Sequence, residues 1–202
     1  MDRTTRTAAL WATAVAVPVA LLVGVLIVVR LIPGTDRTDR PDAAATSPAA
    51  VPAAPVPVAA PKLGPRAAQV CLAVTSQLPS AIRSLPARKV TAGPEQNAAY
   101  GEPPITVQCG GPQPAMCATL AGGSGCVPLD TELLLMNDVC WYAAPGTRAN
   151  VFTTMDREVP VRVTVPSTYE QAAQWANEFS DTVVKTDPSR TTGVPSGCRT
   201  GS

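Results

Sequence analysis

The sequence predicts an α+β domain behind a single N-terminal transmembrane helix. Three observations support this prediction. Residues 7–29 carry no charge, eight prolines fall within residues 33–65, and helical and alternating apolar patterns follow from residue 66 onward. The predicted order is therefore a membrane anchor, a Pro/Ala-rich linker, and a small disulfide-containing domain with two helices packed on an antiparallel sheet.

The uncharged segment is long enough to span a membrane. As a helix, its 23 residues would rise about 35 Å, against a hydrocarbon core of about 30 Å. Such a helix would be apolar on all sides. Pro18 lies near its middle, and a proline is tolerated better in a transmembrane helix than in a helix in water. We assign residues 1–6 to the cytoplasm and residues 7–32 to the anchor.

Whether this segment is cleaved stays open. A cleaved signal peptide has an apolar core of about 7–15 residues, which favours an uncleaved signal-anchor here. The triplet at residues 43–45, three alanines, would nevertheless serve as a cleavage site. Arginines flank both sides of the segment, so the positive-inside rule does not fix its orientation.

All six cysteines lie C-terminal to the anchor. Their even number predicts three disulfides in an oxidising compartment, which places the domain outside the cytoplasm. A mixture of bridged and free thiols, or a metal site, remains as an alternative, although no close CxxC pair supports a metal. The disulfide candidates are Cys71, Cys109, Cys117, Cys126, Cys140 and Cys198.

Residues 33–65 are predicted to be a linker. Proline at this density disfavours an α-helix and favours polyproline II, whose rise of about 3.1 Å per residue gives a spacer of roughly 100 Å. The extracytoplasmic domain is then expected over residues 66–187, with a tail over residues 188–202.

The first helix of the domain is predicted to start at Pro65 or Arg66 and to stop before Pro79. Apolar residues recur at helical spacing and form one stripe that includes Cys71. Residues 82–91 are ambiguous, and residues 93–97 are predicted to form a turn.

A strand is predicted over residues 105–109, where the alternation places Cys109 on the core face. Because Cys71 faces the core from the first helix, a Cys71–Cys109 bond is the first choice of pairing. Residues 112–128 are expected to be irregular, with Cys117 and Cys126 close enough to close this loop on itself.

Four further strands are predicted over residues 129–137, 139–143, 150–154 and 158–165. In the last of these, Pro160 lacks an N–H group, so we expect this strand to lie at an edge of the sheet or to start late.

The second helix is predicted from a capping box, with Ser167 at the N-cap and Glu170 three residues later. Apolar residues continue at helical spacing, with Trp175 and Phe179 expected in the core, and Pro188 ends the pattern. Cys198 is expected to tie the tail back to the domain, with Cys140 suggested as its partner.

The order of motifs resembles a known family. The segments GEPPITVQCGGP, NDVCW and FTTMDREVPVRVTVPSTY follow a cysteine-bearing helix, as in the envelope proteins of high-GC Gram-positive bacteria grouped as domain of unknown function 3515. The resemblance covers residues 67–187. It implies a membrane-anchored or secreted domain, and it carries no activity and no catalytic residue.

Composition excludes several classes of function. The sequence contains no histidine, which removes Ser-His-Asp and Cys-His nucleophiles and His-ligated zinc. From Ala67 onward there are nine Lys and Arg against eleven Asp and Glu, a net charge of −2, so nucleic acid is not an expected partner. The sequence predicts no catalytic residue, no metal site and no cofactor.

Two clusters are candidates for binding. Asp156, Arg157 and Glu158 lie between two predicted strands, where the carboxylates suit general acid–base work or a cation, or else belong to a turn. Trp141 and Tyr142 are candidates for an exposed aromatic patch that binds sugar or peptide, although a tryptophan packed on a disulfide is the commoner outcome.

Three hypotheses of function follow. The first is a membrane-anchored binding or interaction module for a cell-wall component or an envelope protein. The second is a structural subunit of an envelope complex. The third is a cell-wall hydrolase that uses Asp156 with Glu158 or Glu102 as paired carboxylates.

Overall fold

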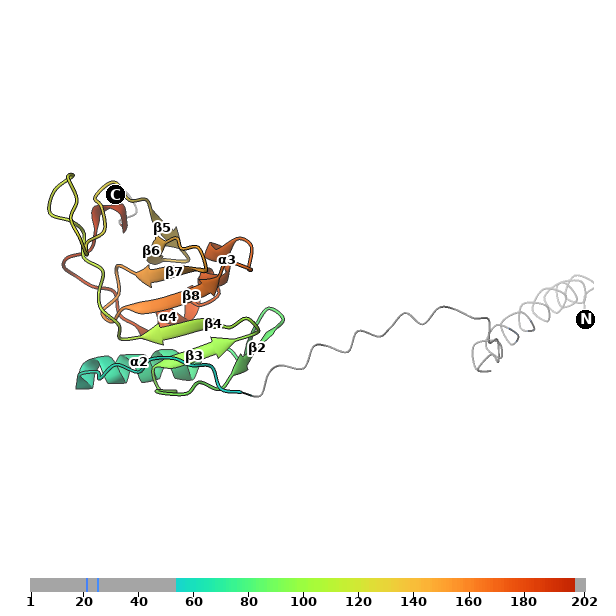
Figure 1. Ribbon diagram of the computed structural model, residues 1–202. Coiled ribbons are helices and arrows are strands. Elements are labelled where there is room, and N and C mark those ends of the chain that lie inside the picture. Colours follow the sequence, from blue (N-terminus) through green and yellow to red (C-terminus); the bar gives the residue numbers. More distant parts are fainter. Residues whose placement is uncertain (1–20, 22–24, 26–53, 199–202) are drawn as a thin grey trace, which may run out of the picture. The chain divides into compact units, whose positions relative to one another are not determined.

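An eight-stranded antiparallel sheet organises the domain (Figure 1). The computed structural model describes residues 54–198 together with Leu21 and Val25. The strand order is β1-β2-β3-β4-β8-β7-β6-β5. The strands are β1 Ala81–Ile82, β2 Leu85–Arg88, β3 Asn97–Tyr100, β4 Ile105–Cys109, β5 Leu133–Met136, β6 Val139–Ala144, β7 Ala149–Thr154 and β8 Val161–Pro166.

Three helices cover one face of this sheet. They are α2 Pro65–Gln77, α3 Ala172–Asn177 and α4 Ser180–Thr186, and a short 3₁₀ turn, η1 Ser196–Cys198, follows near the C-terminus. Val70 and Val74 of α2 and Phe179 and Val183 around α4 pack against the inward valines of β4 and β8. The Cys71–Cys109 disulfide joins α2 to β4 within this core, as predicted.

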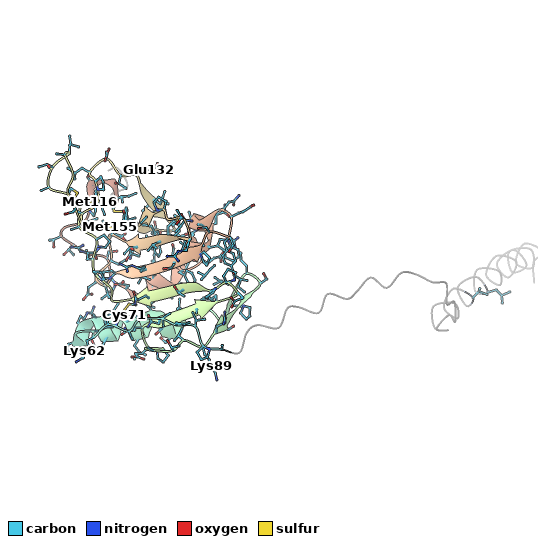
Figure 2. The ribbon with its side chains drawn as sticks, in the orientation of Figure 1. Lys62, Cys71, Lys89, Met116, Glu132 and Met155 are labelled. Atoms are coloured by element: carbon cyan, nitrogen blue, oxygen red, sulfur yellow. A yellow bond between two sulfur atoms is a disulfide. The ribbon has the colours of Figure 1, made fainter. Side chains whose placement is uncertain are left out.

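The other face of the sheet, which we call the outer face, carries a second and smaller cluster. It contains Cys140, Met155 and Cys198, with Met116 packed against them. The Cys140–Cys198 disulfide draws the C-terminal segment over β6, and the Cys117–Cys126 disulfide closes the irregular loop before β5. Figure 2 places Met116 and Met155 together in this region. The predicted set of three disulfides is present.

The folded domain includes residues that were predicted to belong to the linker. Val56 is buried and forms a parallel bridge with Val90. The backbone oxygen of Ala59 accepts hydrogen bonds from the side chains of Asn97 and Gln108. Gly110 packs so closely that an added Cβ would overlap Leu63. Residues 54–64 are therefore part of the domain.

Most predicted strands are present, with changed ends. β4 coincides with the predicted residues 105–109, whereas β5 is shorter than predicted. β8 begins only after Pro160, so the late start is correct and the edge position is wrong, because β8 lies between β4 and β7. The irregular loop holds one short bridge, between Met116 and Val127.

The predicted capping box is wrong. Gln171 occupies the N-cap position of α3, with φ of 53° and no side-chain cap. Ser167 instead donates its hydroxyl to the backbone oxygen of Thr147, at 3.2 Å. The hydroxyl of Tyr169 donates to the Pro103 oxygen at 2.8 Å.

The single predicted second helix is two helices. The helix is interrupted at Phe179, between α3 and α4, where the Phe179 N–H donates to the backbone oxygen of Ala176. The break allows Phe179 to be fully buried as predicted, while Trp175 is only partly buried.

No helix within the described residues is long and apolar enough to cross a membrane. Apart from Leu21 and Val25, the predicted anchor over residues 7–32 lies outside those residues, as do residues 1–6, 33–53 and 199–202.

Candidate functional site

The predicted polar stretch forms a buried charge cluster. Asp156 and Arg157 are 9% and 4% exposed, and Arg157 Nε lies 3.4 Å from Asp156 Oδ1. Arg157 also donates to the backbone oxygens of Asp187, at 3.4 Å, and of Asp138. The guanidinium thus connects the β7–β8 connection, the β5–β6 turn and the end of α4.

Asp187 is the third ionisable member of this cluster, and it is fully buried. One carboxylate oxygen accepts the Val159 N–H at 3.2 Å, while Oδ2 has no partner among the described residues. Burial raises the pKa of Asp187 to about 7, and the Val159 N–H and Arg157 oppose this rise only in part.

The carboxylates predicted as a catalytic pair have separate partners. Glu158 is bound by the guanidinium of Arg66, with both oxygens at 2.7 Å, and this contact lowers the pKa of Glu158. Glu102 pairs with Arg88, while Asp156 faces Arg157. These contacts are those of ion pairs that join elements of the fold.

The predicted aromatic pair is divided between the two faces of the sheet. Trp141 is fully buried on the helix-covered face, where its Nε1 donates to Ser180 Oγ at 3.1 Å. The exposed patch is therefore not formed by Trp141. Tyr142, the next residue of β6, lies on the outer face beside the second cluster.

Tyr142 belongs to a row of side chains across the outer face. Strand register places Gln108 beside Arg162, Arg162 beside Thr153, and Thr153 beside Tyr142. Since neighbours in register share a face, these four side chains form a polar row across β4, β8, β7 and β6.

The two ends of the irregular loop border this row and line an open hollow of about 350 Å³, which we call the Arg162 hollow. Arg162 Nε is buried there without a hydrogen-bond partner. Arg162 forms no ion pair with any residue of the described domain. The lining residues are Pro112, Gln113, Pro114, Gly125, Cys126, Val127, Tyr142 and Arg162.

A second hollow of about 360 Å³ adjoins the first, and Gln113 and Pro114 line both. The C-terminal segment closes it, held by the Cys140–Cys198 bond. Its remaining lining residues are Ala115, Met116, Met155, Arg190, Gly193, Val194 and Pro195. Neither hollow has an acidic lining residue.

A polar hollow of about 490 Å³ lies at the two hairpin turns beside α3 and α4, and its lining side chains other than Gln174 and Asn177 bind one another in pairs. Arg83 pairs with Glu178 at 2.7 Å and lies 4.4 Å from the ring centroid of Trp175. Asn137 Nδ2 donates to Asp181 Oδ1 at 3.1 Å. Asn177 Oδ1 is buried there without a hydrogen-bond partner among the described residues, but the charged side chains of the hollow are already paired, so it is a weaker candidate for binding a charged ligand.

Within residues 54–198 no group of three acidic, cysteine or histidine side chains is placed to hold a metal ion. The sequence patterns place Arg162 opposite the valines of its strand, but they do not show that the loop over residues 112–127 borders it. Arg162 was therefore not predicted as a site residue, and neither was Asp187.

The chain belongs to the family described as protein of unknown function DUF3515, which matches residues 15–192. The resemblance noted in the sequence is thus confirmed. No curated protein and no solved structure matches the sequence. Three disulfides within this family's domain indicate that the domain is extracytoplasmic.

Proposed function

We propose that this DUF3515 protein is a single-pass membrane protein whose folded domain binds a component of the cell envelope. The uncharged residues 7–29 are long enough to anchor it with residues 1–6 in the cytoplasm. Proline-rich residues 33–53 then act as the spacer between the membrane and the domain.

The observation that supports binding is the Arg162 hollow. It combines an aromatic side chain, Tyr142, with a guanidinium that lacks a counter-charge in the described domain. Its volume of about 350 Å³ falls within the range of ligand sites. The Cys117–Cys126 bond restrains one wall, so the site needs little ordering when a ligand enters.

The hydrolase hypothesis has less support from the geometry. Asp156, Glu158 and Glu102 each face an arginine, rather than lining one cleft with free carboxyl groups.

The structural-subunit hypothesis predicts a large exposed apolar patch. The domain instead exposes five large apolar side chains, spread over α2, the loop before β5, β5 and α4, and so few are ordinary on a protein surface. They are Leu72, Leu120, Leu129, Leu135 and Val184.

Site-specific photocrosslinking in intact cells tests the binding proposal. A benzophenone side chain replaces Pro114, on the wall of the hollow, in the full-length protein. The matched control carries it at Leu72, which is 55% exposed on α2. We expect a discrete adduct from position 114 that position 72 does not give, and muramidase digestion distinguishes a wall polymer from a protein. Identical adducts from both positions, or none from position 114, would contradict the proposal.

Membrane fractionation tests the anchor. The full-length chain should stay in the membrane pellet at alkaline pH, while a chain lacking residues 7–32 but exported by a cleavable signal should be released. Release of the full-length chain would contradict the anchor.

A further inference from the structure

We propose that the Arg162 hollow recognises the C-terminal carboxylate of a peptide. This inference rests on the proposed binding function and specifies the ligand. It follows from the state of the Arg162 guanidinium, from the charge of the surrounding wall, and from the few polar groups that line the hollow.

Arg162 lines the hollow with a guanidinium that has no counter-charge among the described residues. Arg162 lies in a central strand, between β4 and β7, so the backbone fixes its base. Its Nε is buried with no hydrogen-bond partner, and none of the four ion pairs of the described domain includes it. A buried charged donor without a partner is unfavourable, and a carboxylate satisfies a guanidinium through two parallel N–H···O bonds.

The surroundings favour an anion. No acidic side chain lines the Arg162 hollow or the adjoining one, and Arg190 adds a second positive charge to the latter. Over the described residues 54–198 the charges nevertheless nearly balance, with eleven Asp and Glu against ten Lys and Arg. The two hollows therefore form a local positive region on a domain of slight negative charge, which attracts carboxylates.

The other lining groups favour a peptide over a sugar acid or a phosphate. Pro112, Pro114 and Val127 present apolar surface, and Tyr142 presents a ring. A sugar needs several side-chain hydrogen-bond partners, but the only amide in the lining, that of Gln113, already donates to the Thr154 oxygen at 3.1 Å. A phosphate is ordinarily held by more donors than one arginine supplies.

The test measures binding at Tyr142 in the full-length protein, reconstituted in phospholipid nanodiscs. The chain has three tyrosines, so ¹³C at the ring Cζ alone gives three NMR signals, one for each residue. Tyr142 lies in the hollow, while Tyr100 is 1% exposed in the core and Tyr169 is bonded to Pro103. The latter two signals report the integrity of the fold and serve as internal controls.

The probes are N-acetyl-trialanine with a free carboxylate, the same peptide as its C-terminal amide, glucuronate and inorganic phosphate. We expect the free acid to shift the Tyr142 signal. It should bind about tenfold or more tightly than the amide, because one hydrogen bond to a charged group changes affinity by about that factor. Arg162→Gln should reduce the affinity for the acid to that for the amide. Arg148→Gln removes the same charge from an exposed position outside the hollow and should change the affinity less than twofold.

Equal binding of the acid and the amide would overturn the inference, as would unchanged affinity of the acid in Arg162→Gln. Glucuronate or phosphate binding as tightly as the peptide acid would overturn the assignment to a peptide. In each case a position-specific adduct at Pro114 in cells would still support the proposed binding function, so the two failures are distinguishable.

Discussion

The sulfur atoms of Cys140 and Cys198 are bonded across 58 residues of sequence, and this bond holds the C-terminal segment over the outer face of the sheet. Beneath that segment Met155 is 1% exposed, although it also borders the hollow that Arg190 and Pro195 line. The disulfide thus builds one wall of a candidate binding region as well as stabilising the domain.

Removal of this bond should uncover Met155. For the double variant Cys140→Ala/Cys198→Ala we expect the free energy of unfolding to fall by about 2–5 kcal/mol, the usual cost of losing a native disulfide in a small domain. Peroxide should oxidise Met155 faster, as measured by peptide mass spectrometry.

The matched control is Cys117→Ala/Cys126→Ala, which opens a loop whose cysteines are only 9 residues apart and leaves the C-terminal segment bonded. Equal rates of Met155 oxidation in the two double variants would show that the Cys140–Cys198 bond does not cover this side chain.

Asp187 should make the stability depend on pH. Its pKa is about 7 in the folded protein against an ordinary value of 3.8, so the folded state favours the protonated carboxyl. The sign follows from linkage: the unfolded chain loses this proton near pH 4 and the folded domain near pH 7, so this carboxyl lowers stability as pH rises through that window.

Asp187→Asn mimics the protonated group and should remove this dependence. We expect the variant's advantage over wild type to grow by roughly 1.4 kcal/mol per pH unit at most between pH 4 and 7, as measured by urea unfolding. A constant difference across that range would show that Asp187 is ionised in the folded protein throughout.

The buried hydrogen bond between Trp141 and Ser180 should stabilise the domain, because without it the indole N–H would be buried with no partner. Ser180→Ala leaves the indole N–H without its partner, which should cost about 1–3 kcal/mol. In a Trp141→Phe background the same substitution should cost less, because no N–H remains to be satisfied.

Ser167→Ala serves as the control for a hydroxyl on the surface, and it should change stability by about 0.5 kcal/mol or less. If Ser180→Ala costs the same in both backgrounds, the Trp141 contact contributes nothing specific.

The sequence predicted those parts of the fold that depend on local pattern. The alternation of Ile105, Val107 and Cys109 identified β4, and the apolar stripe of α2 placed Cys71 opposite Cys109. β3 was not predicted, because Ala98 and Ala99 carry no preference for a strand. Its pairing with β2 and β4 decides its conformation.

The candidate site was less predictable because it depends on contacts between distant segments. Tyr142 was predicted for binding, but its neighbour Trp141 proved to be buried. Arg162 became a candidate only once the loop over residues 112–127 was seen to border it. The capping box failed for a similar reason, because Ser167 and Tyr169 bond to loops far away in sequence.

Thiol labelling on intact cells tests the central claim, an oxidised domain outside the membrane, most directly. A membrane-impermeant phosphine reduces accessible disulfides, and an impermeant maleimide then labels the thiols. We expect labelling of Cys117 and Cys126 only after the phosphine step and without permeabilising the cells, because their disulfide closes the surface loop. Labelling that requires permeabilisation, or that proceeds without the phosphine, would contradict the account.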